Sequence, residues 1–215
     1  MSMFDLSSRN LYLCVAHRHD MAQFLPEVLR GGVDVVQLRE KELPDEVRIA
    51  TAKIMVPICR DFGVPFVMND SPKLGELVGA DGVHVGQDDL SVEECRRILG
   101  AEAIVGLSTH STTEFDAALT QDTTYFSAGP IVPTPTKLGR PGTGASYAVE
   151  CQARSERPVF VTGGVNSTNI GDLVRLGLRH FVVVRFLTES TRPFEDARSL
   201  RGALDEALSM TIEPT

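Results

Sequence analysis

The feature that most constrains the fold of this chain is a regular alternation of short apolar runs with helix-like segments. Eight strand-like runs occur, at residues 11–16, 33–39, 65–70, 82–86, 103–109, 124–130, 158–165 and 181–185. Strands that alternate with helices predict a parallel sheet, because each connection must cross back over the sheet. Eight such units with short, right-handed connections predict a single (β/α)8 TIM barrel over residues 1–215. A doubly wound open sheet is the alternative.

Local signals support the predicted helices. In the segment 91–100, Ser91 is an expected N-cap and Glu94 follows three residues later, which predicts a capping box. The segment 43–63 predicts a longer helix that begins at Pro44, and Pro57 is expected to bend it. Segments 21–32, 166–177 and 192–209 predict further helices, and the tail from about residue 210 is expected to fray. Glycines just before three strand-like runs are expected to end helices in the left-handed conformation: Gly32, Gly79 and Gly177.

Composition and charge narrow the class of protein. The net charge of −8 argues against a uniform basic face for nucleic acid. No apolar run reaches the roughly 18 residues that a membrane span needs, and no secretory signal stands at the start of the sequence. The cysteines are scattered without a CxxC pair, which favours reduced, packed thiols over metal or disulfide roles. They are Cys14, Cys59, Cys95 and Cys151. A cytoplasmic protein is expected.

Two successive strand-like runs end in acidic residues. Asn69 and Asp70 end the third run, and Asp88 and Asp89 follow the fourth. In a (β/α)8 barrel the carboxyl ends of the strands meet at one rim, where the chemistry takes place. Asp70 and Asp89 are therefore expected to lie close enough to share a cation. Mg²⁺ is commonly bound by one or two carboxylates together with phosphate oxygens, so a magnesium site is predicted.

The second strand-like run carries polar residues toward the same rim. In an extended strand, Val33, Val35, Gln37 and Arg39 would point to one side and Val36 and Leu38 to the other, with Lys41 just beyond. A buried arginine needs an anion. That anion is either a neighbouring carboxylate or a substrate phosphate, and the residues alone leave both open.

Two further segments suggest sites for phosphate. The loop after the sixth run is long, and Thr134, Thr136 and Lys137 offer hydroxyls and a positive charge; residues 131–143 form a candidate lid. Gly163 and Gly164 end the seventh run and lead into a helix expected to be capped by Asn166 or Ser167, a common phosphate position in barrels. Two anion sites beside a carboxylate pair predict two phosphorylated small-molecule substrates, one carrying a diphosphate.

These residues occur in motifs that resemble those of a known family. The chain resembles thiamine phosphate synthase in seven motifs that follow the family's order and span nearly the whole sequence. They are VQLREK at 36–41, ND at 69–70, GADGVHVGQDDL at 79–90, GLSTH at 106–110, GPIVPTPTK at 129–137, GGV at 163–165 and VVV at 182–184. The resemblance implies the condensation of an aminopyrimidine methyl diphosphate with a thiazole ethyl phosphate, or its carboxylated form. It also implies that the carbon–oxygen bond ionises first, so that no strong base is needed.

The resemblance assigns roles to individual residues. Asp70 and Asp89 resemble the Mg²⁺ ligands. The implied pyrimidine-diphosphate site comprises Gln37, Arg39, Lys41, Asn69, Ser108 and Lys137, of which Arg39, Lys41, Ser108 and Lys137 are the expected catalytic groups. The implied thiazole-phosphate site comprises Thr134, Thr136, Gly163, Gly164, Val184 and Arg185.

Some interpretations stay open. Arg185 stands where many family members have serine. His84 and His110 are expected to be structural or positioning residues. A thiazole tautomerase of similar fold and a non-catalytic phosphate-binding barrel are the alternative functions, and a homo-oligomer is possible.

Overall fold

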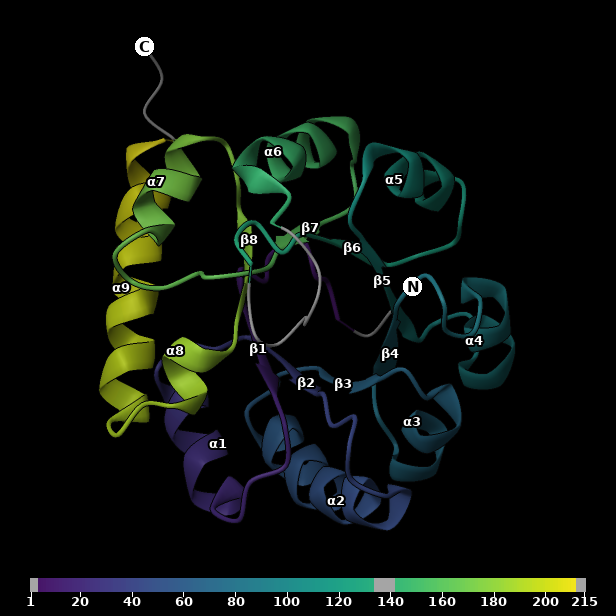
Figure 1. Ribbon diagram of the computed structural model, residues 1–215. Helices are drawn as coiled ribbons and strands as arrows, with labels where there is room; N and C mark the ends of the chain where they lie inside the picture. Colours follow the sequence, from purple (N-terminus) through teal and green to yellow (C-terminus); the bar gives the residue numbers. More distant parts are fainter. Residues whose placement is uncertain (1–3, 134–141, 212–215) are drawn as a thin grey trace.

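The structure, a computed structural model, forms a closed barrel of eight parallel strands in the order β1 to β8 (Figure 1). It describes residues 4–133 and 142–211. The strands are β1 Leu11–Val15, β2 Val35–Leu38, β3 Phe66–Asn69, β4 Gly82–Val85, β5 Ile104–Thr109, β6 Tyr125–Ala128, β7 Val159–Val161 and β8 His180–Val183. The predicted (β/α)8 barrel is confirmed, and closure of β8 onto β1 excludes the open sheet.

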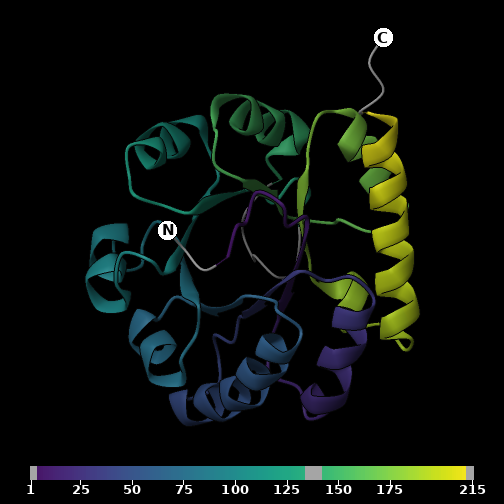
Figure 2. The same ribbon diagram turned by 180° about the vertical axis from the view of Figure 1, so that it is seen from behind.

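Helices form a ring outside the strands (Figure 1). They are α1 Met21–Arg30, α2 Asp45–Asp61, α3 Pro72–Val78, α4 Val92–Leu99, α5 Thr112–Leu119, α6 Gly144–Arg154, α7 Ile170–Arg175, α8 Arg185–Thr188 and α9 Pro193–Met210. Seen from behind, the segment before β1 crosses the centre of the barrel (Figure 2), and Leu6 packs into the barrel interior. Helix α9 reaches Met210, and residues 212–215 of the expected frayed tail lie outside the described residues.

Most of the predicted helix starts and ends are confirmed. Ser91 Oγ accepts the Glu94 N–H at 3.2 Å and the Glu94 carboxylate accepts the Ser91 N–H at 3.0 Å, so the capping box is confirmed. Pro44 is the N-cap of α2 rather than its first residue, and α2 continues as one helix past Pro57. The three glycines before strands have positive φ as predicted: Gly32 at 107°, Gly79 at 71° and Gly177 at 96°.

The predicted cap of the helix after β7 is wrong. Helix α7 begins only at Ile170, and Asn169 occupies the N-cap position. The Asn166 side chain instead accepts the backbone N–H groups of Thr168 and Asn169, which closes a turn before the helix. These side-chain bonds close a turn over residues 166–169, and the helix begins one residue beyond it.

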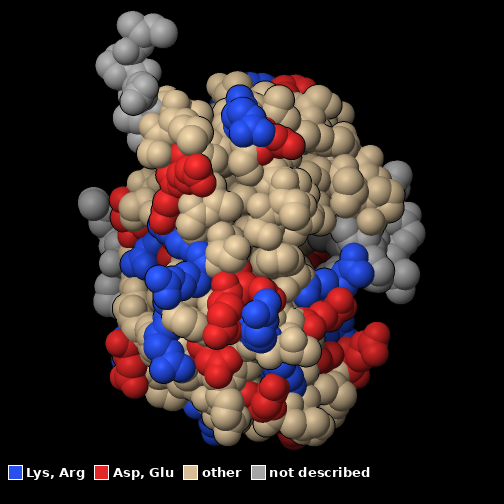
Figure 3. Space-filling view, turned by 90° about the vertical axis from the view of Figure 1, so that its left-hand side faces the viewer, with Lys and Arg blue, Asp and Glu red and all other residues tan. Residues whose placement is uncertain are grey.

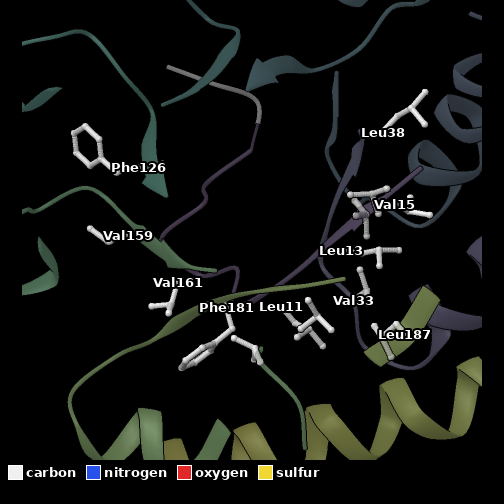
Figure 4. Close-up of a cluster of buried hydrophobic side chains, with 14 of the residues drawn as sticks. Leu11, Leu13, Val15, Val33, Leu38, Phe126, Val159, Val161, Phe181 and Leu187 are labelled. Atoms are coloured by element: carbon white, nitrogen blue, oxygen red, sulfur yellow. The ribbon is translucent and has the colours of Figure 1, made fainter. Parts of the chain in front are cut away.

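Alternate strand residues separate two apolar layers. Leu11, Leu13 and Val15 of β1 pack outward against the helices, and Figure 4 shows part of this outer cluster with Leu187 of α8. The interior cluster contains Tyr12 of β1 and residues of like parity in the other strands. The side assignments of Val35, Val36 and Leu38 are confirmed. That of Val33 is wrong, because β2 begins only at Val35 and Val33 packs in the outer cluster.

Two further properties of the described residues are the hydropathy of the helices and the charge on one face of the molecule. Among the described residues, no helix is both long and apolar enough to cross a membrane. On the face formed by α9 and its neighbours, acidic and basic side chains are interspersed (Figure 3). All four cysteines lie among the described residues as buried thiols outside any disulfide.

At the amino end of the barrel, two carboxylates form hydrogen bonds with the backbone of a neighbouring strand. Asp34, just before β2, accepts the N–H groups of Asn10 at 3.0 Å and Leu11 at 2.8 Å. Its Oδ2 also lies 2.8 Å from the Arg201 guanidinium of α9. Asp81, just before β4, accepts the Phe66 N–H at 2.8 Å in the same manner. Each acid accepts the N–H of the first residue of the preceding strand.

Asp34→Ala is expected to lower the free energy of unfolding by about 2–3 kcal/mol, because two backbone donors and a partly buried arginine lose their acceptor. Urea titration measures this loss. Asp205→Ala is the matched control, because Asp205 also contacts Arg201 but is exposed, and its loss should cost under about 0.5 kcal/mol. Equal losses in both variants would contradict the role given to Asp34.

Candidate active site

A cavity of about 840 Å³ opens at the carboxyl ends of the strands. It collects the predicted site residues that the structure describes, from six different strands and the loops after them. They are Gln37, Arg39, Lys41, Asn69, Asp70, Asp89, Ser108, Gly163, Gly164, Val184 and Arg185. Thr134, Thr136 and Lys137, with most of the candidate lid, lie outside the described residues. The expected shared rim is confirmed as a location, and the roles of these residues stay predictions.

The acids after β3 and β4 meet in this cavity. Asp70 has a left-handed backbone with φ of 62°, uncommon for a residue with a side chain, and its Oδ2 lies 2.8 Å from Lys41 Nζ. Asp89 Oδ2 accepts the Gly86 N–H at 2.7 Å, which turns the β4 loop back toward the strand end. The rim therefore presents the Asp70 carboxylate in contact with the Lys41 ammonium group and beside the Asp89 carboxylate.

Burial raises the pKa of Asp70 above its ordinary value, and the neighbouring Asp89 carboxylate raises it further. The Lys41 ammonium opposes both effects without cancelling them. A second cation beside the two acids would relieve this repulsion. Among the described residues no cluster of three or more acidic, histidine or cysteine side chains could hold a metal alone. A metal here would depend on ligand oxygens to complete its coordination.

Buried amides and hydroxyls line the floor of the cavity. Asn69 is 3% exposed, and within the described part of the chain its Nδ2 has no hydrogen-bond partner. An unpartnered buried donor is costly, so this group favours a ligand acceptor in the cavity. Gln37 and Ser108, also buried, belong to a hydrogen-bonded chain that crosses the barrel interior.

The glycines after β7 have a packing reason to be glycine. Both have positive φ, 98° at Gly163 and 76° at Gly164. A Cβ at Gly163 would lie 2.6 Å from the Pro130 side chain, and one at Gly164 would lie 2.6 Å from that of Val132. The glycines thus allow the loop after β6 to approach the loop after β7. Gly163 and Gly164 both face the cavity.

Arg185 lies at the end of β8. Val184 is the N-cap of the short helix α8, and Arg185 is its first residue. The Arg185 side chain is exposed and lines the cavity with Phe186 and Glu189. No ion pair of Arg185 occurs among the residues that the structure describes.

Sequence reasoning missed several residues of the cavity floor. Tyr12, Tyr125, Ser127 and Thr162 line it in addition to the predicted set. Strand parity was the available signal, because Tyr12, Tyr125 and Ser127 share the inward face with Gln37 and Ser108. The hydroxyl of Thr162 is buried and lacks a partner among the described residues.

The two histidines have defined neighbours. His84 is buried, with Nδ1 at 2.9 Å from the Tyr125 hydroxyl and Nε2 at 2.9 Å from Ser108 Oγ. His110 Nδ1 lies 2.9 Å from Glu114 Oε2 at the start of α5. These contacts agree with a positioning or structural role for both histidines.

The closed barrel and its charged cavity at the carboxyl ends of the strands define a (β/α)8-barrel enzyme. Residues 11–187 match the profile of the family described as thiamine monophosphate synthase. The chain belongs to this family.

Named relatives agree with this assignment. The chain is 39% identical to thiamine-phosphate synthase of Acidothermus cellulolyticus, over 94% of this chain and 98% of that one. It is 41% identical to thiamine-phosphate synthase of Thermus thermophilus, over 82% and 85% of the two chains. Its fold is similar to that of thiamine phosphate pyrophosphorylase from Pyrococcus furiosus, with a TM-score of 0.84, 24% identity and coverage of 93% and 96%.

Proposed function

We propose that this chain is a thiamine phosphate synthase, a transferase. It joins the methylene carbon of an aminopyrimidine methyl diphosphate to the ring nitrogen of a thiazole ethyl phosphate and releases pyrophosphate. Membership of the family supports the reaction, and one structural observation supports it independently. Asp70, Asp89 and Lys41 face one cavity, where a diphosphate can meet both a lysine and a carboxylate-bound cation.

We further propose that Asp70 and Asp89 hold Mg²⁺ there. The donor set fits, because Mg²⁺ prefers hard oxygen ligands and takes its remaining ligands from phosphate and water. Burial, and after it the neighbouring Asp89 carboxylate, raise the pKa of Asp70, and a bound cation would stabilise both charged carboxylates. When bound, the ion supplies charge neutralisation to the diphosphate oxygens.

The residues suit a reaction driven by departure of the diphosphate. Lys41 and Arg39 line the cavity beside the acids and would stabilise negative charge on the leaving oxygens. Asn69 Nδ2 offers a buried donor that needs an acceptor. The thiazole phosphate would bind on the opposite side, near Gly164, Val184 and Arg185. Holding both substrates in contact contributes the rest of the acceleration.

Purified protein with both substrates and Mg²⁺ is expected to form thiamine phosphate, and EDTA is expected to stop the reaction. A thiazole tautomerase would convert the carboxylated thiazole phosphate alone and would not need the diphosphate. A non-catalytic barrel would bind the phosphates and give no product. Absence of product with either thiazole form would refute the synthase. The cytoplasmic location and the homo-oligomer stay predictions.

Arg185→Ser is expected to raise KM for the thiazole phosphate about tenfold, because a hydrogen bond to a charged group contributes about 1.5 kcal/mol. KM for the diphosphate should stay unchanged. Steady-state kinetics with each substrate varied in turn separates the two. Arg192→Ser is the matched control, since Arg192 is exposed and does not line the cavity. A larger rise in KM for the diphosphate would move Arg185 to the other site.

A further inference from the structure

A continuous chain of hydrogen bonds crosses the interior of the barrel along the floor of the cavity. Gln37 Nε2 lies 2.9 Å from the Tyr12 hydroxyl, which lies 2.9 Å from the Tyr125 hydroxyl. Tyr125 lies 2.9 Å from His84 Nδ1, and His84 Nε2 lies 2.9 Å from Ser108 Oγ. The chain joins five strands and ends at two cavity residues, Gln37 and Ser108.

The middle of this chain is held rigidly. Tyr12 and Tyr125 are buried to within 1% of full coverage, and burial raises the pKa of both phenols, so each keeps its one hydrogen. Phe160 makes edge contacts with both rings, at 5.2 and 5.3 Å between centroids. Gly106 leaves room for the Tyr125 ring, because a Cβ at that position would overlap it. The two hydroxyls therefore have fixed partners.

Counting hydrogens gives the chain a direction. The Cys14 thiol donates to Gln37 Oε1 at 3.2 Å, so the Gln37 amide nitrogen faces Tyr12 and donates to it. Every donor of the chain has an acceptor when Tyr12 gives its single hydrogen to Tyr125 and Tyr125 gives its own to His84 Nδ1. A ring nitrogen that accepts carries no hydrogen. In this arrangement of hydrogens His84 is the Nε2–H tautomer and donates to Ser108 Oγ.

The direction of these hydrogen bonds determines which bonds the Ser108 hydroxyl accepts and which it can donate. Because its oxygen accepts from His84, its hydrogen is left for Ser127 Oγ, 3.2 Å away, or for an acceptor in the cavity. Ser108 lines the same cavity as Lys41 and Asp70.

We propose that Tyr12, Tyr125 and His84 are positioning residues that fix the Ser108 hydroxyl as a hydrogen-bond donor to the departing diphosphate. This inference rests on the proposed function. It also links the two ends of the site, since Gln37 starts the chain that Ser108 completes. His84 acts through Ser108 and transfers no proton.

The direction of the chain is tested without turnover. In protein labelled with ¹⁵N-histidine, long-range ¹H–¹⁵N correlation spectra report which ring nitrogen of His84 carries hydrogen. His84→Gln identifies its signals. The Nε2–H form is expected in the free protein and with Mg²⁺ and inorganic pyrophosphate bound. An Nδ1–H or doubly protonated ring would overturn the proposal, whatever reaction the protein catalyses.

The consequence for catalysis is tested with Tyr125→Phe, which removes one link and keeps the ring. We expect kcat to fall about tenfold and KM for the thiazole phosphate to stay unchanged. Tyr147→Phe is the matched control, because the Tyr147 hydroxyl donates to the Ser111 carbonyl outside the chain. Its kinetic constants should be those of the parent protein. Equal effects in the two variants would overturn the proposal.

A double variant separates positioning from packing. If Tyr125 acts through Ser108, Tyr125→Phe should cause no further loss of kcat in a Ser108→Ala background. A full additional tenfold loss would mean that Tyr125 acts on the site by another route and would overturn the proposal. A protein with the expected tautomer and no synthase product would instead refute the proposed function alone.

Discussion

Replacing Asp89 with asparagine is expected to lower kcat by about 10²–10³-fold and to leave the melting temperature unchanged. The asparagine side chain can still accept the Gly86 N–H that Asp89 now accepts at 2.7 Å, so the loop after β4 keeps its hydrogen bond. The substitution therefore removes the charge and little else. Because Asp89 is exposed at the rim, packing in the barrel is not disturbed.

Kinetics over a range of Mg²⁺ concentrations measures this effect. A lost ligand should also raise the Mg²⁺ concentration needed for half-maximal rate. Asp88→Asn is the matched control, since Asp88 is the adjacent exposed acid, and its kcat should stay within about twofold of the parent. Wild-type kcat for the Asp89 variant at limiting Mg²⁺ would show that the metal assignment is wrong. A larger loss at Asp88 would shift the site by one residue.

The barrel was predictable because its determinants are local and repeated. Period-two patterns and helix-ending glycines recur along the chain, and the closed sheet follows from their number. Helix α8 escaped prediction because four residues cannot show a helical period. The cap of α7 was misplaced because asparagine favours both a helix start and the turn that precedes α7 here.

The candidate site was predictable at its rim and less so at its floor. Strand ends can be read from sequence, and this predicts Asp70 and Asp89 at one edge of the barrel. The contact between Tyr12 and Tyr125 spans 113 residues of sequence and depends on how the closed barrel packs its interior. Strand parity says only that each tyrosine points inward. The roles of Asn69 and Ser108 came from the family resemblance, because neither residue type indicates a ligand by itself.

The ion pair between Lys41 and Asp70 is also a product of the fold. The sequence predicts both residues at the rim and predicts that Lys41 binds the diphosphate. In the structure, Lys41 Nζ contacts Asp70 Oδ2 at 2.8 Å. The lysine thus holds the carboxylate that is the proposed metal ligand. When a diphosphate and its cation bind, the diphosphate would pair with the Lys41 ammonium group and the cation with the Asp70 carboxylate.

Lys41→Gln is expected to lower kcat/KM for the diphosphate by about 10²–10³-fold, because the variant loses one positive charge beside the leaving oxygens. The fold should survive, since a half-exposed ion pair contributes under about 1 kcal/mol. Steady-state kinetics with the diphosphate varied, together with thermal melting, measures both. Lys53→Gln is the matched control, because Lys53 is an exposed lysine of α2 away from the cavity.

The same variant is expected to change the pH dependence of metal binding. Burial and Asp89 already raise the pKa of Asp70, and Lys41 is the group that lowers it. Without Lys41 the Asp70 carboxyl stays protonated to a higher pH, and a protonated carboxyl does not bind Mg²⁺. The acid limb of the Mg²⁺ affinity should therefore move to higher pH in Lys41→Gln and stay in place in Lys53→Gln. Calorimetric titration with Mg²⁺ and inorganic pyrophosphate at several pH values measures the shift, and a limb that moved to lower pH would show that Lys41 does not act on Asp70.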